Sequence, residues 1–226
     1  MSRKIIASFV CCCMLVATTS AFGQINLFES KNLADWDFHY FDIRENPLTD
    51  VSVEDVFSFA DDGRLLCTGL PFGYLATKES YKNFKLALEW RWPAEPTNSG
   101  VFIQITDTPA DSFLPKSVEV QLRHRDAGDI WAFHGRMIVE PAERLRRVEN
   151  ATIGKFVGVQ RSINVENPLG QWNSMEILNT NGLIVVTVNG RIVSWTTGAE
   201  PIAGRIGLQS EGGPIEFRNA ILTVLP

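Results

Sequence analysis

The sequence predicts an all-β protein built as a single β-sandwich. Helical periodicity is almost absent, and short runs of Val, Ile, Phe, Trp and Leu recur from one end of the chain to the other. Gly, Asn, Asp and Pro separate these runs at regular intervals. Many short strands spaced in this way are typical of a sandwich or a barrel.

The first half of the chain contains a predicted hairpin and three longer predicted strands. Residues 56–59 and 65–67 flank an Asp-Asp-Gly turn, a sequence that favours a tight hairpin. Apolar residues then alternate with polar ones, or form β-branched runs, at 84–92, 101–106 and 118–123. Such patterns indicate strands that have one face turned towards a core.

The second half reads as a meander followed by two closing strands. Two Asn-Gly pairs separate the strands of the meander, and this dipeptide adopts the positive φ angles that two-residue hairpins need. The strands predicted here are 172–178, 183–188, 192–195, 205–209 and 215–224. The one plausible helix is the short segment 141–150, which begins Pro-Ala-Glu-Arg.

The first 23 residues resemble an export signal. Arg3 and Lys4 precede an apolar run from about residue 5 to 17, and Ala21-Phe22-Gly23 fits a small-x-small cleavage site. The alternative is an uncleaved anchor, but the run is shorter than the roughly 20 residues that span a bilayer. We therefore expect a signal at 1–23, a domain at 24–226, and a periplasmic or extracellular protein with no membrane span after cleavage.

Charge argues against nucleic acid as a partner, and cysteine content argues against an internal disulfide. The chain has 21 basic and 26 acidic residues, and it carries no basic run of the kind that binds nucleic acid. Cys67 is the single cysteine outside the predicted signal, so no internal disulfide is expected. It lies in an apolar strand, which favours a buried, inert thiol.

Strand alternation predicts a polar face to which several strands contribute. Amide, carboxylate and guanidinium groups match sugar hydroxyls, which both donate and accept hydrogen bonds. Trp131 could stack on a sugar ring. Glu211 would share the face of Gln209 if the strand 205–209 continues to it. The alternative is an ordinary solvated sheet face. The predicted face consists of Arg91, Gln104, Glu119, Gln121 and Gln209.

Few motifs carry chemistry. The sequence has no phosphate loop, no dinucleotide fingerprint and no cysteine-rich metal site, and its histidines lack the spacing of a zinc site. Glu119 and His134 remain as candidates for general acid–base work. His134 could equally be a loop histidine held by backbone hydrogen bonds, and Asp126 and Asp129 are more typical of turns.

A series of short motifs resembles the 3-keto-disaccharide hydrolase family. Each motif is weak alone, but their number and order cover nearly all of the chain after residue 23. In the opening motif, which Leu27, Phe28, Leu33 and Trp36 match, Glu29-Ser30 stands where the family has Asn-Gly, and Asp35 where it has Gly. Among the motifs are Asn98-Ser99-Gly100-Val101, Glu119-Val120-Gln121, Gly128-Asp129-Ile130-Trp131, Gly170-Gln171-Trp172-Asn173 and Gly207-Leu208-Gln209-Ser210-Glu211-Gly212.

The resemblance implies a concanavalin A-like jelly-roll sandwich that acts on glycosides oxidised at C3. Such a reaction needs a base near C2, a cation or donor near the C3 oxygen and an acid near the glycosidic oxygen. We expect Glu119 or His134 as acid or base, and Arg91, or a divalent cation held by carboxylate and amide oxygens, at the C3 oxygen. The residues expected to bind the sugar are Asn98, Gln104, Gln121, Trp131 and Gln209.

Two other functions are compatible with the same sequence. A carbohydrate-binding module would use the same polar face without a tuned acid or base. A protein–protein interaction module would instead expose an apolar patch near Phe113, Leu114 and Trp131.

Overall fold

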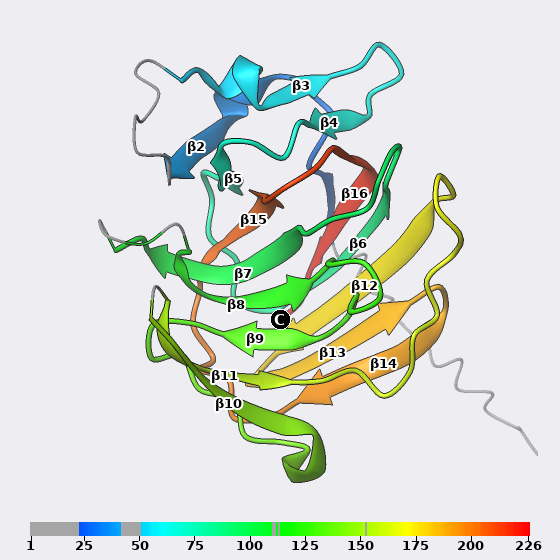
Figure 1. The fold of residues 1–226 in the computed structure, drawn as a ribbon. Helices are drawn as coiled ribbons and strands as arrows, with labels where there is room; N and C mark the ends of the chain where they lie inside the picture. The colour runs from blue at the N-terminus through cyan, green and yellow to red at the C-terminus, as the bar shows by residue number, and fades with distance from the viewer. Residues whose placement is uncertain (1–22, 42–50, 110–111, 113, 152) are drawn as a thin grey trace, which may run out of the picture.

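The protein is described by a computed structural model, which covers residues 23–41, 51–109, 112, 114–151 and 153–226. The predicted export signal, apart from Gly23, lies outside these residues. Two antiparallel sheets pack face to face, as the sequence predicts (Figure 1). No helix in the described part of the chain is long and apolar enough to cross a membrane.

The first sheet, sheet A, contains the predicted meander, the long strand 84–91 and the last of the predicted strands, 215–224. Its strand order is β14-β13-β12-β6-β16-β4-β3, and β1 pairs with β16. Its strands are β1 (Gln24–Asn26), β3 (Phe57–Phe59), β4 (Leu65–Cys67), β6 (Phe84–Arg91), β12 (Asn173–Thr180), β13 (Leu183–Val188), β14 (Arg191–Thr196) and β16 (Ile215–Val224).

The second sheet, sheet B, has the order β10-β11-β9-β8-β7-β15-β5-β2. Figure 1 shows β7, β8 and β9 side by side in this sheet. The single-turn 3-10 helices η1 (Leu33–Asp35), η2 (Val53–Asp55) and η3 (Ala142–Arg144) lie outside the sheets. The strands of sheet B are β2 (Trp36–Phe41), β5 (Phe72–Thr77), β7 (Gly100–Asp107), β8 (Lys116–Gln121), β9 (Ile130–Ala132), β10 (Leu145–Asn150), β11 (Gly154–Val159) and β15 (Arg205–Ser210).

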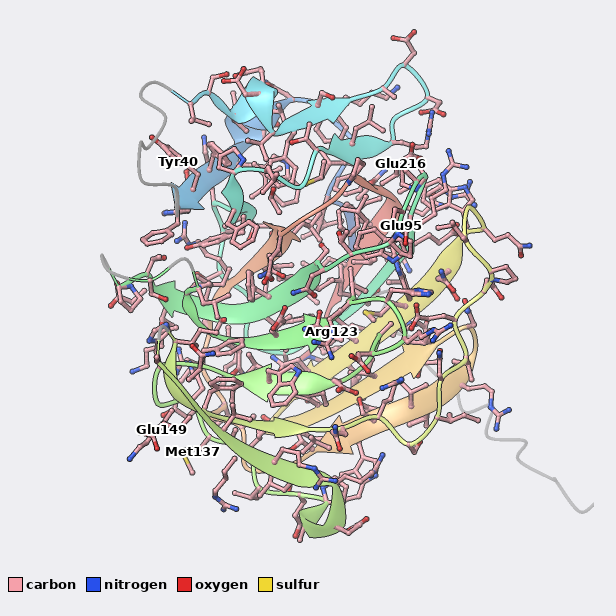
Figure 2. All side chains as sticks on the ribbon, in the orientation of Figure 1. Tyr40, Glu95, Arg123, Met137, Glu149 and Glu216 are labelled. Carbon is pink, nitrogen blue, oxygen red and sulfur yellow. The ribbon has the colours of Figure 1, made fainter. Side chains whose placement is uncertain are left out.

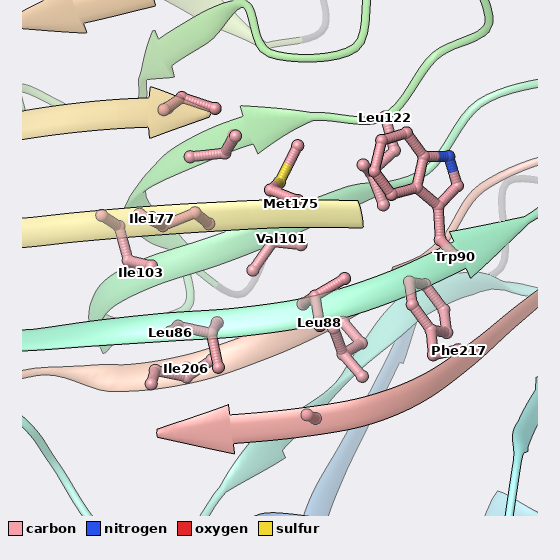
Figure 3. Close-up of a cluster of buried hydrophobic side chains, with 14 of the residues drawn as sticks. Leu86, Leu88, Trp90, Val101, Ile103, Leu122, Met175, Ile177, Ile206 and Phe217 are labelled. Carbon is pink, nitrogen blue, oxygen red and sulfur yellow. The ribbon is translucent and has the colours of Figure 1, made fainter. Parts of the chain in front are cut away.

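The core fills the space between the sheets with the apolar residues that alternation predicts to face inward. Leu86, Leu88 and Trp90 of β6 are buried against Val101 and Ile103 of β7 (Figure 3). Cys67 is also buried, and burial raises the pKa of its thiol to about 11. It is therefore an inert core residue, as predicted.

Local turn chemistry is confirmed in the meander. Asn181 and Gly182 both have positive φ angles, as do Asn189 and Gly190. These pairs form the turns between β12 and β13 and between β13 and β14, as two-residue hairpins require. The pairing of β13 with β14 shifts register once, between Val186 and Thr187.

The predicted helix at 141–150 is wrong. Only Ala142–Arg144 forms a 3-10 turn, and Leu145–Asn150 is strand β10, whose six residues pair with β11. Local propensity for a helix is weak, and pairing with a neighbouring strand overrides it here.

Candidate functional site

The outer face of sheet B is built from side chains that alternate with the core residues. On β8, Val118 and Val120 point into the core, so Glu119 points outward. In the register of the sheet, Glu119 lies opposite Phe102 on β7 and Trp131 on β9. We call this outward side of β7, β8, β9, β11 and β15 the pocket face.

A pocket of about 400 Å³ opens on the pocket face. This volume suits a small organic ligand. It brings together acidic, amide and aromatic side chains from strands and loops that are distant in sequence. The residues that matter below are Asn98, Glu119, Gln121, Arg123, Asp126, Asp129, Trp131, Phe133, Phe156 and Glu211.

Glu119 carries a carboxyl group that is almost completely shielded from water. Its exposed fraction is 3 %, and its Oε1 atom has no hydrogen-bond partner among the described residues. Burial raises the pKa of Glu119 well above its ordinary value, and repulsion by Glu211 raises it further, whereas Arg123 opposes the change. Both effects favour the protonated form of Glu119, which is the form that can donate a proton.

Glu211 is the second carboxyl group of the pocket. It follows β15 directly, and its backbone forms an isolated bridge with Asn98. The side chains of Asn98 and Gln209 hydrogen-bond to its carboxylate, but burial prevails and raises the pKa of Glu211 to about 7. At neutral pH this group therefore exchanges a proton readily, which is what a general base requires.

Aromatic rings form one wall of the pocket. The ring of Trp131 meets that of Phe156 edge-on at 5.5 Å between centroids, and Phe133 lies 5.2 Å from the same ring. Trp131 is half-buried, so part of its surface remains open to a ligand. An indole in this position can cover the apolar face of a sugar ring.

The loop after β8 forms a charged rim. Gln121 Oε1 accepts hydrogen bonds from the backbone N–H groups of Leu122 and Arg123, at 2.9 and 2.8 Å. The Arg123 side chain pairs with Asp126, and Figure 2 shows Arg123 over the middle of sheet B. Gln121 thus fixes the start of this loop.

Asp126 and Asp129 both form ion pairs with the guanidinium group of Arg161. Arg161 Nη1 lies 3.0 Å from Asp126 Oδ1 and 3.4 Å from Asp129 Oδ1, and the Arg161 backbone N–H donates to Asp129 at 2.8 Å. Burial nevertheless raises the pKa of Asp129. Both aspartates organise the loop, in keeping with the turn-forming role that the sequence favours.

The prediction that Arg91 shares this face is wrong. Arg91 is on β6 of sheet A, and its Nε donates to Glu216 Oε2 at 2.7 Å on the outer face of that sheet. Its guanidinium also lies 4.7 Å from the ring centre of Trp172. Alternation correctly placed Arg91 outward, but it does not say to which sheet a strand belongs.

Gln104 is also absent from the pocket lining. It has a φ of 56°, and the pairing of β7 with β8 shifts register between Ile103 and Asp107. This irregularity turns Gln104, whose amide donates to Asn179 Oδ1 of sheet A at 3.3 Å. A bulge interrupts alternation, and the predicted face of Gln104 is therefore wrong.

His134 lies beside the pocket face and is not among the pocket-lining residues. It has a φ of 52°, and its Nε2 is 3.1 Å from Ser112 Oγ. His134 is thus a loop histidine, as the alternative predicts, but its ring contacts the Ser112 hydroxyl and not the backbone groups that the alternative named. Asn98, Glu119, Gln121 and Trp131 do converge in the pocket. Gln209, also predicted to bind the sugar, is not among the lining residues and acts on the site through Glu211.

Sequence reasoning did not select Glu211, Phe133 or Phe156 as site residues. The phase of Glu211 with Gln209 was the available signal, because residues two apart on a strand share a face. The apolar patch expected for a protein-binding module is not exposed at Leu114, which is 2 % accessible. Phe113 lies outside the described residues.

The sequence leaves open a divalent cation held by carboxylate and amide oxygens. Within the described residues, no group of three or more His, Cys, Asp or Glu side chains is placed to hold a metal ion. Besides Asp126 and Asp129, which pair with Arg161, the pocket offers the carboxyl groups of Glu119 and Glu211 together with amide oxygens.

A family model described as a 3-keto-alpha-glucoside-1,2-lyase-like domain matches residues 23–223. The chain belongs to this family. Membership confirms the resemblance that the motifs indicate, and it supports a carbohydrate-active hydrolase or lyase, or a carbohydrate-binding module. No curated protein is similar enough to the chain to be counted as a relative.

Solved structures share the fold of this family member. A provisionally assigned glycosyl hydrolase from Parabacteroides distasonis is 18 % identical, with a TM-score of 0.61 over 90 % of this chain and 94 % of its own. A Bacillus licheniformis β-glucanase is 12 % identical, with a TM-score of 0.56 over 92 % and 100 %. The Bacillus subtilis carbohydrate-binding module CBM66 is 9 % identical, with a TM-score of 0.56 over 84 % and 95 %. These likenesses confirm the jelly-roll sandwich.

Proposed function

We propose that the chain is an enzyme that cleaves 3-keto-glycosides by elimination across C1 and C2. The observation that carries this proposal is the pair of buried carboxyl groups, Glu119 and Glu211, in one pocket with an aromatic wall. The description of its family as 3-keto-alpha-glucoside-1,2-lyase-like supports the substrate class. Perturbed carboxyl groups in a cleft are typical of acid–base catalysis.

The first step is loss of the C2 proton. A ketone at C3 makes this proton acidic, because the electron pair left on C2 delocalises onto the C3 oxygen as an enolate. Glu211, with a pKa of about 7, is the base in this proposal. Its hydrogen bonds from Asn98 and Gln209 hold the carboxylate in one orientation.

The second step is departure of the group on C1. The enolate electron pair returns to form a C1–C2 double bond, and the bond from C1 to the glycosidic oxygen breaks. Protonated Glu119 donates its proton to that oxygen. Water then adds across the double bond, with hydroxyl to C1 and a proton to C2, which yields the free 3-keto sugar.

Binding in this scheme uses the rest of the pocket. Trp131 covers the sugar ring in this scheme. Arg123 lines the pocket, and its charge acts on both carboxyl groups, so it is the cation assigned to the C3 oxygen. Arg91 has no part in the scheme because it lies on the other sheet. His134 is left out because it does not line the pocket.

The test compares 4-nitrophenyl 3-keto-α-glucoside with the corresponding unoxidised glucoside. We expect release of nitrophenol from the oxidised substrate alone, because only the C3 ketone acidifies the C2 proton. Cleavage of both glucosides at similar rates would contradict the elimination and point to ordinary glycoside hydrolysis.

A carbohydrate-binding module is the second candidate. Asn98 Oδ1, Gln209 Oε1 and Glu119 Oε1 are buried acceptors without partners among the described residues, and sugar hydroxyls could donate to them. Saturable binding of glycans in calorimetry, with no turnover of 3-keto-glycosides, would favour this function over the enzyme.

Export belongs to the same proposal and rests on the sequence of residues 1–23. A mature protein recovered outside the cytoplasm should begin close to residue 24. N-terminal sequencing of the purified protein checks this, and an intact residue 1 in the exported protein would contradict cleavage.

A further inference from the structure

Gly100 lies directly against the Glu119 carboxyl group. A Cβ atom at Gly100 would be 2.2 Å from Glu119 Oε1, 2.8 Å from its Cγ and 2.9 Å from its Cδ. Gly100 does not have a positive φ, so its backbone could accommodate any residue. The need for glycine therefore comes from the close approach of Glu119.

The surrounding register explains why Glu119 lies over Gly100. The residues directly opposite Glu119 on the two neighbouring strands are Phe102 and Trp131, and both are aromatic. Gly100 stands two residues before Phe102 on the same face, and its missing side chain leaves a space beside these residues. The Glu119 carboxyl group occupies that space.

The same space leads towards the second carboxyl group. β15 pairs with β7 so that Leu208 faces Val101, and the next residue, Gln209, comes level with Gly100. Gln209 hydrogen-bonds to Glu211, and Glu211 is the charged group that contributes most to the raised pKa of Glu119. Glu119 therefore leans across Gly100 towards Glu211.

We propose that Gly100 is a positioning residue that places the Glu119 carboxyl group beside Glu211 and so forms the acid–base pair. This inference rests on the proposed function for its catalytic consequence. Arg123 and Asp129 are the other charged groups that act on Glu119, whereas the three atoms nearest to the position of the missing Cβ all belong to Glu119 itself.

The test is Gly100→Ala, with Gly207→Ala as the matched control. Gly207 is also a strand glycine on the pocket face without a positive φ, and its added Cβ would be 2.8 Å from Ile105 Cδ1, the end of a flexible side chain. We expect Gly100→Ala to lower kcat at least tenfold with KM changed less than threefold and the pH–rate profile displaced. Gly207→Ala should leave the profile in place.

A second substitution separates positioning from general damage. Glu119→Asp shortens the side chain by one methylene and relieves the closest contact, the one at 2.2 Å with Oε1, so Gly100→Ala/Glu119→Asp should recover activity relative to Gly100→Ala. Recovery of folding in the double variant, if Gly100→Ala alone does not fold, would support the proposal as well. An unchanged pH profile in Gly100→Ala would overturn it, as would a double variant no better than the single one in both activity and folding.

A carboxyl titration keeps this inference separate from the proposed function. In protein labelled with ¹³C at the glutamate carboxyl carbon, the signals of Glu119 and Glu211 can be assigned with Glu119→Gln and Glu211→Gln. Gly100→Ala should displace both titration curves even if no 3-keto-glycoside is cleaved. Curves identical to those of the wild type would overturn the positioning role, whereas absence of turnover in the wild type would overturn only the enzymatic function.

Discussion

Carboxyl groups on the two outward faces of the sandwich can have different neighbours, as a comparison of Glu216 and Glu89 on sheet A with Glu119 on sheet B shows. On sheet A, Glu216 pairs with Arg64 and Arg91, at 2.6 and 2.7 Å, and Glu89 accepts from Arg218 at 2.7 Å. On sheet B, Glu119 is buried, and one of its oxygens has no hydrogen-bond partner in the part of the chain that the structure describes. Strand alternation places carboxylates outward on both faces, and the neighbouring cations decide whether they stabilise the fold or remain available for proton transfer.

The same contrast applies to the two tryptophans. On sheet A, Arg91 and Arg218 both lie over Trp172, at 4.7 and 4.1 Å from its ring centre. On sheet B, Trp131 contacts Phe156 and lines the pocket. An indole covered by cations contributes to stability, whereas an indole at a pocket wall is free to meet a ligand.

The largest expected effect is on catalysis. Glu119→Gln and Glu211→Gln should each lower kcat on a 3-keto-glycoside by about 10²–10⁴-fold, the usual contribution of a general acid or base. Glu216→Gln, on the outer face of sheet A, should keep kcat within about twofold because that face takes no part in the reaction. Steady-state kinetics of the three variants checks this, and equal losses in all three would erase the distinction between the faces.

A smaller effect concerns stability and pH. The pKa of Glu211 is raised from 4.5 to about 7 in the folded protein, so the folded state holds its proton more tightly than the unfolded state. This contribution is fully present below pH 4.5 and is lost as pH rises to about 7, by up to about 3 kcal/mol. Urea unfolding from pH 4 to pH 8 should therefore show Glu211→Gln gaining stability relative to the wild type as pH rises. A constant difference across this range would contradict the raised pKa.

Substitution of Trp131 should weaken substrate binding, whereas substitution of Trp172 should not. Trp131→Ala should raise KM by about tenfold, because the ring covers apolar surface worth roughly 1–2 kcal/mol. Trp172→Ala is the matched control and should leave KM unchanged while costing stability through the lost contacts with Arg91 and Arg218. A KM effect that is equal in the two variants would mean that Trp131 does not meet the substrate.

The smallest expected effect is at Arg91. Arg91→Ala removes one partner of a partly exposed ion pair, and Glu216 keeps Arg64. We expect less than about 1 kcal/mol lost in the free energy of unfolding and kcat/KM within about twofold of the wild type. A hundredfold loss of kcat/KM would restore the role that the sequence alone predicts for this residue.

The sequence predicts the fold well because its signals are local. Alternation and Asn-Gly turns are properties of short segments, and the meander from β12 to β14 follows them closely. The segment Leu145–Asn150 is where local propensity fails, since its conformation depends on pairing with β11.

The site is predicted only in part because it depends on long-range arrangement. Glu119, Gln121, Asn98 and Trp131 are found by their residue type and phase. Alternation carries no information on which sheet a strand joins, hence the error at Arg91. Nor does it foresee the irregularity at Gln104, or the continuation past β15 that brings Glu211 beside Asn98.

Proton exchange at C2 of a 3-keto-α-glucoside in D₂O, followed by ¹H NMR, reports the proposed first step apart from cleavage. With an alkyl leaving group, the wild type should both exchange and eliminate, and Glu211→Gln should do neither. Glu119→Gln should still exchange the C2 proton while releasing the alcohol slowly, because it retains the base and lacks the acid. Exchange at the wild-type rate in Glu211→Gln would contradict the claim that the two buried carboxyl groups of sheet B are the acid and base.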